Sequence, residues 1–424
     1  MKIEVPYGKD GKITVEFPEE NFYFAVDRIK KPAVYDLKDA IRSALRAPVG
    51  TSPLSDMVKH GDKVLIVADD LTRPTPQKLI LPVLLDELNA VGVPDRDIGV
   101  LIALGTHRPM REEEIEERFG SEVLERVPVM NHNFRDSNVL VNLGRTESNI
   151  DVYVNKSVGE ADFVIGVGNI VPHVYGWGGG SKIIQPGVCG EETTGMTHII
   201  GGRTRPLVPK LTGKFENPIM DEIRAVALKA GLKFIVNTVL NHEDKVAQVF
   251  AGDPIEAHRK GVEYADGIYC PEIPGYADIV IVSSYPADID YWQAIKPLDF
   301  GIAAVKEGGT VILVTPCPER VAPTHPAFLG RALLDFDENL KAIEAGEIDD
   351  LVAGATLLDH AQILERAEVI CYSDGLTRDD KEALGFRDAS TIEEAIEMAL
   401  EREGKNAKIG VLKCGEILPR VKTS

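Results

Sequence analysis

The sequence predicts an α/β protein with two domains, each a largely parallel sheet flanked by helices. Three observations support this prediction. The chain has 424 residues, more than one ordinary hydrophobic core organises. Apolar, β-rich runs alternate with helical patterns almost throughout, as expected of parallel strands joined by crossover helices. The segment YCPEIPGYADIV contains two prolines and a glycine, which indicates a domain boundary near residue 272.

The first domain is expected to cover residues 1–272. The run KVLIVA at residues 63–68 is typical of a buried strand, and helical spacing of apolar residues follows over residues 76–91. Residues 98–104 form the next apolar run, before the acidic helical segment REEEIEERF. The strand pattern returns at residues 162–167 and 234–240, and residues 255–265 show helical spacing.

The second domain is expected to cover residues 273–405. Strands are predicted at residues 279–283, 310–315 and 368–372, and helices at 291–306, 325–346, 358–366 and 391–403. Residues 406–424 are predicted to hold a final strand, KIGVLK, and a tail. The pattern leaves open whether this strand returns to the first domain or joins the second.

Polar clusters come directly after the predicted strands. DDLTRPTP follows KVLIVA, GTHRP follows IGVLIAL, GNIVPH follows DFVIGV, and SSYPADIDYWQ follows DIVIV. Ligands of open α/β sheets bind beyond the carboxyl ends of the strands. We therefore expect these loops to share one cleft, with the active site between the domains.

Composition and charge exclude several classes of partner. The formal net charge is −20, which disfavours nucleic acid and anionic membranes because phosphate binding needs a basic face. No apolar run is long enough to span a bilayer, and the start MKIEVPYGKD lacks the apolar core of a secretory signal. The five cysteines are widely spaced and form no C-x-x-C pair, which favours a reducing, cytoplasmic setting.

The stretch VPHVYGWGGGSKIIQPG, residues 171–187, packs one histidine, one lysine and a cluster of glycines together. It fails the G-x-x-x-x-G-K-[ST] pattern of a P-loop, because Ser181 replaces the last glycine and Ile183 follows the lysine. The upstream Gly166 and Gly168 also lack the third glycine of a dinucleotide-binding fingerprint. Glycines at this density are costly to order, so we interpret the stretch as a loop that holds a ligand.

His107 and His173 both lie just past predicted strand ends. An imidazole near neutral pH can take up a proton and return it, which suits a reversible reaction. The other histidines, apart from His198, lack such settings and are interpreted as structural or surface residues: His60, His132, His242, His258, His325 and His360.

His198 ends EETTGMTH, in a helix expected to begin near Glu191. It can serve as a metal ligand only if another molecule supplies the remaining ligands. Arg73, Arg108, Lys182 and Lys296 are candidate anion contacts. Gln293 and Lys296 are three residues apart at the start of a predicted helix and so share one face.

Taken in order, these segments resemble the motifs of the lactate racemase family, the nickel-pincer-nucleotide enzymes that act on α-hydroxy acids. The resemblance extends over residues 70–296, and the length and two-domain pattern extend it to the whole chain. The matching residues are Asp70 to Pro74, Gly105 to Arg108, Pro172, His173, Gly176, Gly179, Gly180, Lys182, Pro186, Gly187, Thr197, His198, Gln293 and Lys296.

The resemblance implies a nickel-pincer nucleotide, a pyridinium-3-thioamide-5-thiocarboxylic acid mononucleotide that carries nickel. Lys182 would hold it covalently, and His198 would complete a square-planar nickel site in which the cofactor supplies the other ligands. Residues 1–272 would then be the cofactor-binding domain. The remaining cofactor contacts implied are Asp70, Thr72, Gly179 and Gly180. Assembly would require cofactor-biosynthesis proteins as partners.

The implied activity is racemisation or epimerisation at C2 of a 2-hydroxy acid, with lactate as the default substrate and malate, longer hydroxy acids or sugar acids as alternatives. Our hypothesis is that one histidine takes the hydroxyl proton while hydride passes to the cofactor. Inversion then needs an acid/base on each side, which His107 and His173 would supply. Arg73 and Lys296 would clamp the carboxylate and Gln293 would position an oxygen.

Other functions stay open at this point. A hydroxyacid dehydratase or lyase and a non-catalytic nickel- or nucleotide-binding protein both fit the same loops, and the broken glycine fingerprint argues against an NAD-dependent dehydrogenase. The chain also departs from the family's pattern. Gly178 stands where serine is frequent, Trp292 where a smaller aromatic residue is common, and Trp177 lies within the glycine loop. Both indoles either reshape the pocket or pack between the domains.

Overall fold

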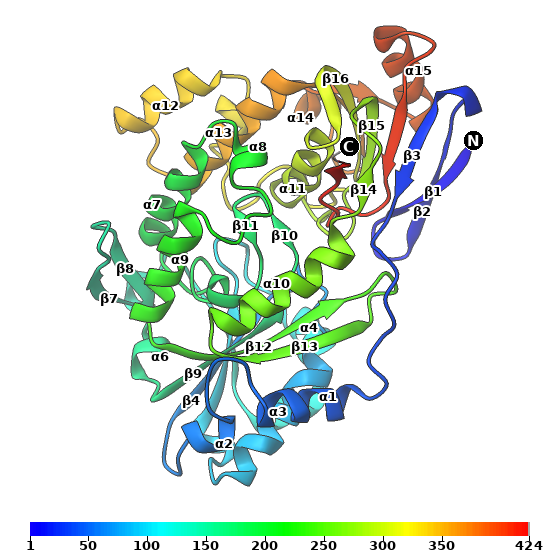
Figure 1. Ribbon diagram of the computed structural model, residues 1–424. Helices are drawn as coiled ribbons and strands as arrows, with labels where there is room; N and C mark the ends of the chain where they lie inside the picture. Colours follow the sequence, from blue (N-terminus) through cyan, green and yellow to red (C-terminus); the bar gives the residue numbers. More distant parts are fainter. Residues whose placement is uncertain (423–424) are drawn as a thin grey trace.

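The computed structural model describes residues 1–422 and contains two six-stranded sheets with helices on both faces of each (Figure 1). In the first sheet, neighbouring strands are parallel except for the antiparallel edge pair β12–β13. Its order is β13 (Val246–Gly252), β12 (Leu232–Leu240), β9 (Phe163–Asn169), β4 (Val64–Asp69), β5 (Ile98–Ala103) and β6 (Val129–Asn131). The predicted α/β class is confirmed.

Strand β4 shows why the first sheet is so apolar. Val64 and Ile66 pack with α1 (Leu37–Arg46) and α3 (Gln77–Ala90), whereas Leu65 and Val67 pack with α9 (Pro218–Lys229) on the other face. Because helices cover both faces, all six residues of the strand are buried. Polar side chains can therefore enter only where the strand ends, and the Asp69-Asp70 pair does so.

The second sheet is parallel throughout. Its order is β18 (Arg387–Ala389), β17 (Glu368–Tyr372), β16 (Val305–Val314), β15 (Ala277–Ser283), β19 (Ile409–Leu412) and β3 (Phe22–Val26). The final strand β19 thus lies in the second sheet. Strand β3 also lies there, beside β19, although the sequence pattern assigned residues 1–272 to the first domain. The chain starts in the second domain and then crosses to the first (Figure 1).

The predicted helices are present, but several bounds differ. The helix expected over residues 291–306 ends at Ile302, because β16 begins at Val305, and the helix expected over residues 358–366 begins earlier, at Leu351. The helix expected over residues 325–346 begins only at Phe336. Pro323 and Pro326 disfavour a helix at the start of that segment, and a short 3-10 turn, Leu329–Arg331, follows them. The main helices besides α1, α3 and α9 are α4 (Glu112–Phe119), α5 (Ser121–Arg126), α7 (Glu191–Gly202), α10 (Glu256–Tyr269), α11 (Tyr291–Ile302), α12 (Phe336–Glu344), α13 (Leu351–Arg366), α14 (Arg378–Ala383) and α15 (Ile392–Glu403).

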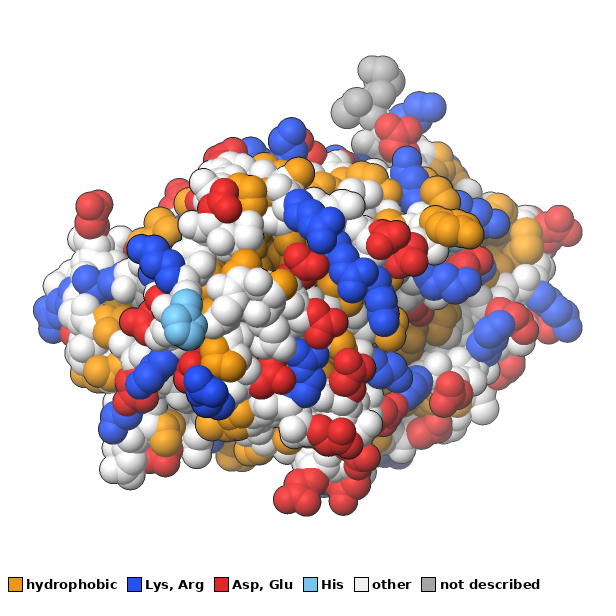
Figure 2. Space-filling model, turned by 90° about the horizontal axis from the view of Figure 1, so that it is seen from below, with side chains coloured by type: hydrophobic (Ala, Val, Ile, Leu, Met, Phe, Trp, Pro, Cys, Tyr) orange, Lys and Arg blue, Asp and Glu red, His pale blue; other side chains and the backbone are white. Residues whose placement is uncertain are grey.

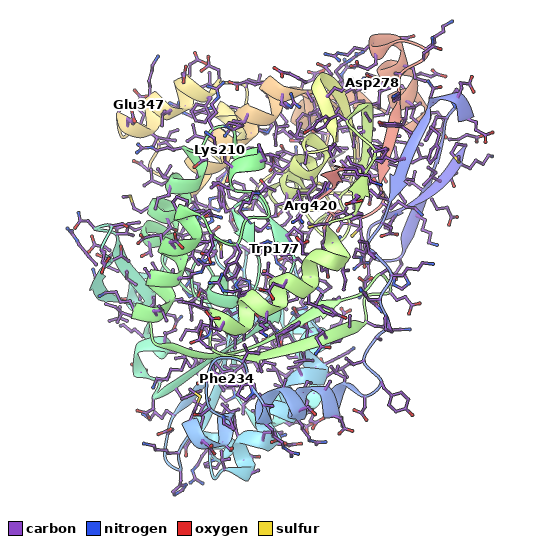
Figure 3. The ribbon with its side chains drawn as sticks, viewed as in Figure 1. Trp177, Lys210, Phe234, Asp278, Glu347 and Arg420 are labelled. Atoms are coloured by element: carbon purple, nitrogen blue, oxygen red, sulfur yellow. The ribbon has the colours of Figure 1, made fainter. Side chains whose placement is uncertain are left out.

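Three short hairpins and one parallel two-stranded pair, β14 (Glu272–Ile273) with β20 (Arg420–Val421), complete the described fold. The hairpins are β1 (Lys2–Tyr7) with β2 (Gly11–Glu16), β7 (Leu140–Arg145) with β8 (Asp151–Asn155), and β10 (Pro172–His173) with β11 (Gly176–Trp177). The last of these carries the first half of the glycine loop. Its Trp177 packs in the same cluster as Ala294 and Leu298 of the second domain, and Figure 3 shows it between the two sheets. Trp177 therefore packs between the domains.

The surface beneath the first sheet carries acidic and basic side chains interspersed with one another (Figure 2). This mixture is the arrangement of a solvated face, whereas a nucleic-acid partner needs a continuous basic one. Among residues 1–422, no helix has the length and apolar character needed to cross a bilayer.

Candidate active site

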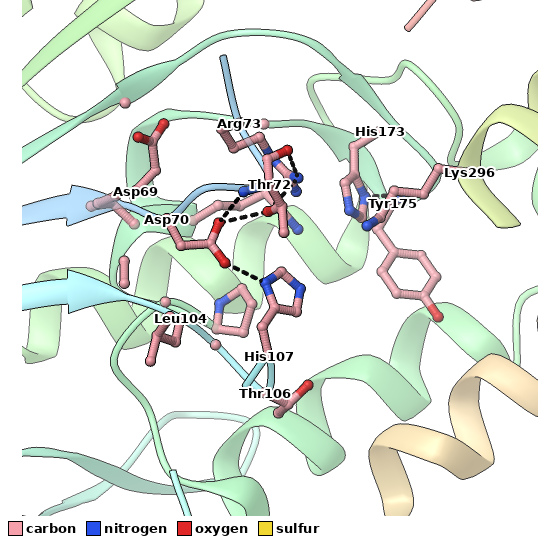
Figure 4. A pocket seen from close by; sticks show the side chains of 18 of the residues that line it. Asp69, Asp70, Thr72, Arg73, Leu104, Thr106, His107, His173, Tyr175 and Lys296 are labelled. Atoms are coloured by element: carbon pink, nitrogen blue, oxygen red, sulfur yellow. Dashed lines mark hydrogen bonds and ion pairs between the residues drawn. The ribbon is translucent and has the colours of Figure 1, made fainter. Parts of the chain in front are cut away.

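A cavity of about 150 Å³ opens where the carboxyl ends of β4, β5, β9 and β12 face α11 and α13 of the second domain. Most of the predicted site residues line it. They are Asp70, Thr72, Arg73, His107, His173, Gly179, Lys182, His198 and Lys296. The predicted interdomain position of the site agrees with this arrangement, which Figure 4 shows from close by.

His107 follows β5 and is held by Asp70, which follows the neighbouring strand β4. Its Nδ1 lies 2.7 Å from Asp70 Oδ2 (Figure 4). Burial alone would raise the pKa of Asp70, but His107, the charge of Arg73 and a hydrogen bond from Thr72 hold that pKa well below its usual range. The carboxylate is therefore ionised, and it fixes the His107 proton on Nδ1.

The other ring nitrogen of His107 meets the second domain. Gln293, in the first turn of α11, places its side-chain amide nitrogen 2.8 Å from His107 Nε2. Lys296 donates to the amide oxygen of the same glutamine at 2.6 Å, which fixes the orientation of the amide. Burial and the charges of Lys296 and Arg73 outweigh Asp70 and lower the pKa of His107. The imidazole is thus neutral, with an unprotonated Nε2.

His173 stands on the other wall, at the end of β10. The backbone N–H of Tyr175 donates to its Nδ1 at 3.1 Å, so the proton of the neutral ring is on Nε2. Burial lowers the pKa of His173 well below its usual value, and the charges of Lys182, Lys296 and Arg73 add to this effect. His107 and His173 therefore hold opposite tautomers, with a lone pair at Nε2 of His107 and a proton at Nε2 of His173.

Lys182 lies in a single 3-10 turn, Gly180–Ile183, at the back of the cavity. Its Nζ is buried and has no hydrogen-bond partner among residues 1–422. Burial and the charge of Arg73 lower its pKa to about 7, so a large share of the amine is uncharged at neutral pH. An amine in this state is a nucleophile and can form a covalent bond to an acyl-type group.

His198 projects into the same cavity from α7. Its Nδ1 lies 2.8 Å from the carbonyl oxygen of Thr194, one turn earlier, which places the ring proton on Nδ1 and leaves the Nε2 lone pair free. Burial and the charge of Lys182 lower the pKa of His198 to about 3, so the ring is neutral. A neutral imidazole whose other nitrogen donates to a carbonyl has the arrangement of a metal ligand.

Three cations converge in this cavity although the protein is strongly acidic. Arg73, Lys182 and Lys296 all line it. Burial and the charges of Arg73 and Lys182 lower the pKa of Lys296 well below its usual value, because the three groups repel one another where water is scarce. A bound carboxylate relieves that repulsion, so the site favours a small anion.

The glycine loop is tight for a reason that the sequence interpretation did not give. A Cβ at Gly179 would come within 2.9 Å of the Asn169 carbonyl and of Asn237 Oδ1, and a Cβ at Gly180 within 2.4 Å of His258 Nδ1. Protein atoms thus require these glycines. Gly179 borders the cavity, but Gly180 packs against His258 and lies outside the lining, so its predicted cofactor contact is replaced by a packing role.

Arg108 differs from its sequence interpretation as an anion contact, whereas His325 has a structural role, one of the two that were expected. Arg108 is bound by Glu114 and by Glu319, with closest contacts of 2.8 Å and 2.6 Å, so its guanidinium is already paired. His325, interpreted as structural or surface, is buried and makes a contact with Thr106 across the domain boundary. The sequence gives no signal for this contact, because residues 106 and 325 meet only through the packing of two separate domains.

Comparisons with known proteins show the family of this chain. The lactate racemase N-terminal domain model matches residues 7–205 and the C-terminal domain model matches residues 274–417. A lactate racemase from Lactiplantibacillus plantarum is 31% identical over 428 aligned residues, covering 98% of each chain. A lactate racemase from Thermoanaerobacterium thermosaccharolyticum is 33% identical over 75% of each chain.

Solved structures give the same picture. The lactate racemase apoprotein from Thermoanaerobacterium thermosaccharolyticum matches with a TM-score of 0.86 and 29% identity, covering 100% of each chain. A protein from Thermotoga maritima matches with a TM-score of 0.72 over 93% of this chain and 100% of that one, and at 20% identity this likeness shows the fold alone. The matched domains, the full-length relatives and the shared fold place this chain in the lactate racemase family, a family of isomerases.

Proposed function

We propose that this protein racemises a 2-hydroxy acid, with lactate as the default substrate, by using His107 and His173 as the acid/base pair. The observation that carries the proposal is the opposite protonation of Nε2 on the two imidazoles, which share one cavity with three cations. Both curated relatives are lactate racemases, which supports the reaction class and the substrate.

The residues present fit the nickel-pincer nucleotide. Lys182 offers a buried amine with no protein partner and a pKa near 7, as covalent attachment requires. His198 offers a free Nε2 lone pair on a neutral ring, as one protein ligand to nickel requires. Asp70, Thr72 and Gly179 border the same cavity and would contact the rest of the group. When bound, this cofactor would supply the hydride acceptor that the protein's own side chains lack.

The chain's own residues would bind the substrate and move its hydroxyl proton. Arg73 and Lys296 would hold the carboxylate, and the Gln293 amide, which reaches His107 Nε2 at 2.8 Å, would yield its place to the substrate oxygen. His107 is poised to accept the hydroxyl proton at Nε2. His173 offers an Nε2–H hydrogen bond to the substrate oxygen, and it can transfer that proton only after Nδ1 has taken one up, because a neutral imidazole that loses its proton becomes an imidazolate. Protonation of Nδ1, and acceptance of a proton at Nε2 in the reverse direction, both require the contact from Tyr175 N–H to open.

The location we propose is the cytoplasm, with cofactor-biosynthesis proteins as partners. All five cysteines are buried free thiols, as expected in a reducing compartment. Without the biosynthetic proteins, the purified chain is expected to be inactive.

The decisive experiment uses protein produced together with those biosynthetic proteins. Intact-mass measurement should show a covalent adduct on the parent protein and none on Lys182→Ala. Chromatography on a chiral column should show that the loaded enzyme converts each lactate enantiomer to the racemate. We expect His107→Ala and His173→Ala each to lower kcat by about 100- to 10,000-fold while keeping the adduct. A loaded protein that converts neither enantiomer, or a variant that keeps the parent rate, contradicts the proposal. Formation of an unsaturated acid instead would identify a dehydratase.

A further inference from the structure

His325 lies on the loop between β16 and α12 and is fully buried. Its Nδ1 is 2.6 Å from Asp350 Oδ2, and its Nε2 is 3.0 Å from the hydroxyl oxygen of Thr106. The Asp350 carboxylate accepts the Nδ1 proton, so Nε2 accepts the hydroxyl hydrogen of Thr106. This second bond crosses from the second domain to the first.

The contact between His325 and Thr106 lies beside the contact between Gln293 and His107, which joins the two domains at the active site. Thr106 directly precedes His107, and Trp292 directly precedes Gln293, the residue that reaches His107 across the cleft. The indole of Trp292 stacks on the His325 ring, with centroids 4.2 Å apart and planes 20° from parallel. The His325 ring thus contacts both Thr106 and Trp292. These residues directly precede His107 and Gln293, which meet across the cleft.

The far side of His325 is also fixed. Asp350 accepts from the backbone N–H of Ala353 at 2.9 Å and so caps α13, the helix whose Val352 and Thr356 line the cavity. Glu191 lies close enough for a metal ion to join it to His325 and Asp350. However, the Arg135 guanidinium already lies 2.7 Å from Glu191 and 3.6 Å from Asp350, so the protein itself balances these charges.

We propose that His325, oriented by Asp350, is a positioning residue that sets the register of the two domains at the active site. It does so through Thr106 on the first domain and Trp292 on the second, and thereby holds His107 opposite Gln293. The proposal goes beyond the racemase function and rests on it only for its kinetic readout. Misplacing a catalytic group by about 1 Å costs on the order of 100-fold in rate, so loss of this register should lower kcat more than it raises KM.

The test separates the two bonds of the imidazole. His325→Gln places an amide near the former Nε2 and retains the Thr106 contact, whereas His325→Asn places one near the former Nδ1 and retains Asp350. We expect kcat to fall about 10- to 100-fold in His325→Leu and His325→Asn, with partial recovery in His325→Gln. Thr106→Val should lower kcat similarly, and its effect should not add to that of His325→Leu.

A second readout does not need the cofactor. Amide hydrogen exchange of the unloaded protein, followed by mass spectrometry, should rise together in residues 104–108 and 289–294 of His325→Leu and Thr106→Val. The matched control is His132→Gln, which removes a buried histidine bonded to Cys189 O at 2.9 Å within the first domain. It should lose stability without coupled exchange in those two segments.

Two results overturn the proposal. One is unchanged kcat and exchange in Thr106→Val, and the other is an equal loss in His325→Gln and His325→Leu. If the loaded parent protein shows no racemase activity, the proposed function fails, but the exchange experiment still decides whether His325 sets the register.

Discussion

At the scale of single residues, the cavity lowers the pKa of the Lys182 amine. Burial and the neighbouring charge of Arg73 lower its pKa to about 7, and its Nζ has no hydrogen-bond partner among residues 1–422. A lysine in water keeps its proton until far more alkaline pH. The fold therefore leaves the Lys182 amine partly uncharged, as the proposed covalent attachment requires.

Burial and the charge of Arg73 both lower the pKa of Lys182. We therefore expect Arg73→Gln to raise this pKa, because the substitution removes the charge and leaves the burial. The unloaded protein is labelled competitively with trace acetic anhydride from roughly pH 6 to 10. Mass spectrometry then gives the pH at which the labelling of each lysine, and so its uncharged fraction, is half-maximal. Exposed Lys38 on α1 serves as the internal control. An unchanged Lys182 midpoint in the variant means that Arg73 does not act on the amine.

At the scale of elements, the glycine loop is shaped by its protein neighbours. Gly180→Ala should lower the free energy of unfolding by roughly 1–3 kcal/mol, because φ is +54° and the new Cβ meets the His258 ring at 2.4 Å. The matched change Gly267→Ala, on the exposed side of α10 with no heavy atom near its Cβ, should instead stabilise by about 0.5–1 kcal/mol. Urea denaturation measures both.

Adding His258→Ala to Gly180→Ala separates the two causes. The double variant should lose less stability than the sum of the single changes, because the clash disappears and only the backbone strain remains. Strict additivity would show that the imidazole does not restrict this position.

At the scale of the whole molecule, stability should depend on a carboxyl pair buried within the second domain. Asp359 on α13 borders both the active-site cavity and a larger outer cleft of about 1190 Å³, which Asp299 on α11 also lines. Burial and mutual repulsion raise the pKa of Asp299 well above its usual value, and burial raises that of Asp359 to about 7. The folded pair thus keeps a proton that the unfolded chain releases.

A folded state that binds more protons loses stability as pH rises above about 4. Asp299→Asn removes the part of this loss that Asp299 contributes, so it should raise the free energy of unfolding by about 2 kcal/mol more at about pH 8 than at about pH 5.5. Chemical denaturation at both pH values measures the difference. The control is Asp10→Asn, the same charge change at an exposed turn, which should change the free energy of unfolding equally at the two pH values. Equal changes for Asp299→Asn would contradict the conclusion that the buried pair of Asp299 and Asp359 keeps a proton.

Much of the fold follows from local sequence patterns. The apolar run around Val64–Asp69 and the apolar runs at residues 279–282 in β15 and 311–314 in β16 identify buried parallel strands, because both faces of each are covered. Strand β3 could not be assigned to its sheet, since the five residues FYFAV give no information on a partner as distant in the sequence as β19. The helix predicted from residue 325 failed because two prolines, Pro323 and Pro326, outweigh the apolar spacing there.

The sequence alone identified the side chains that gather in the cavity. His107 and His173 were candidates because they follow strands, and Lys182 because it follows the glycine turn. His198 and Lys296 lie inside helices and were assigned specific roles only through the family resemblance. The tertiary structure alone decided the protonation of these side chains. The tautomers follow from Asp70 and the Tyr175 N–H, and the lowered pKa of Lys182 follows from burial near Arg73. Tertiary packing also recruited His325, through Thr106 of the other domain. Desolvation and hydrogen bonding depend on which groups meet in space, and a linear pattern of residues does not contain that information.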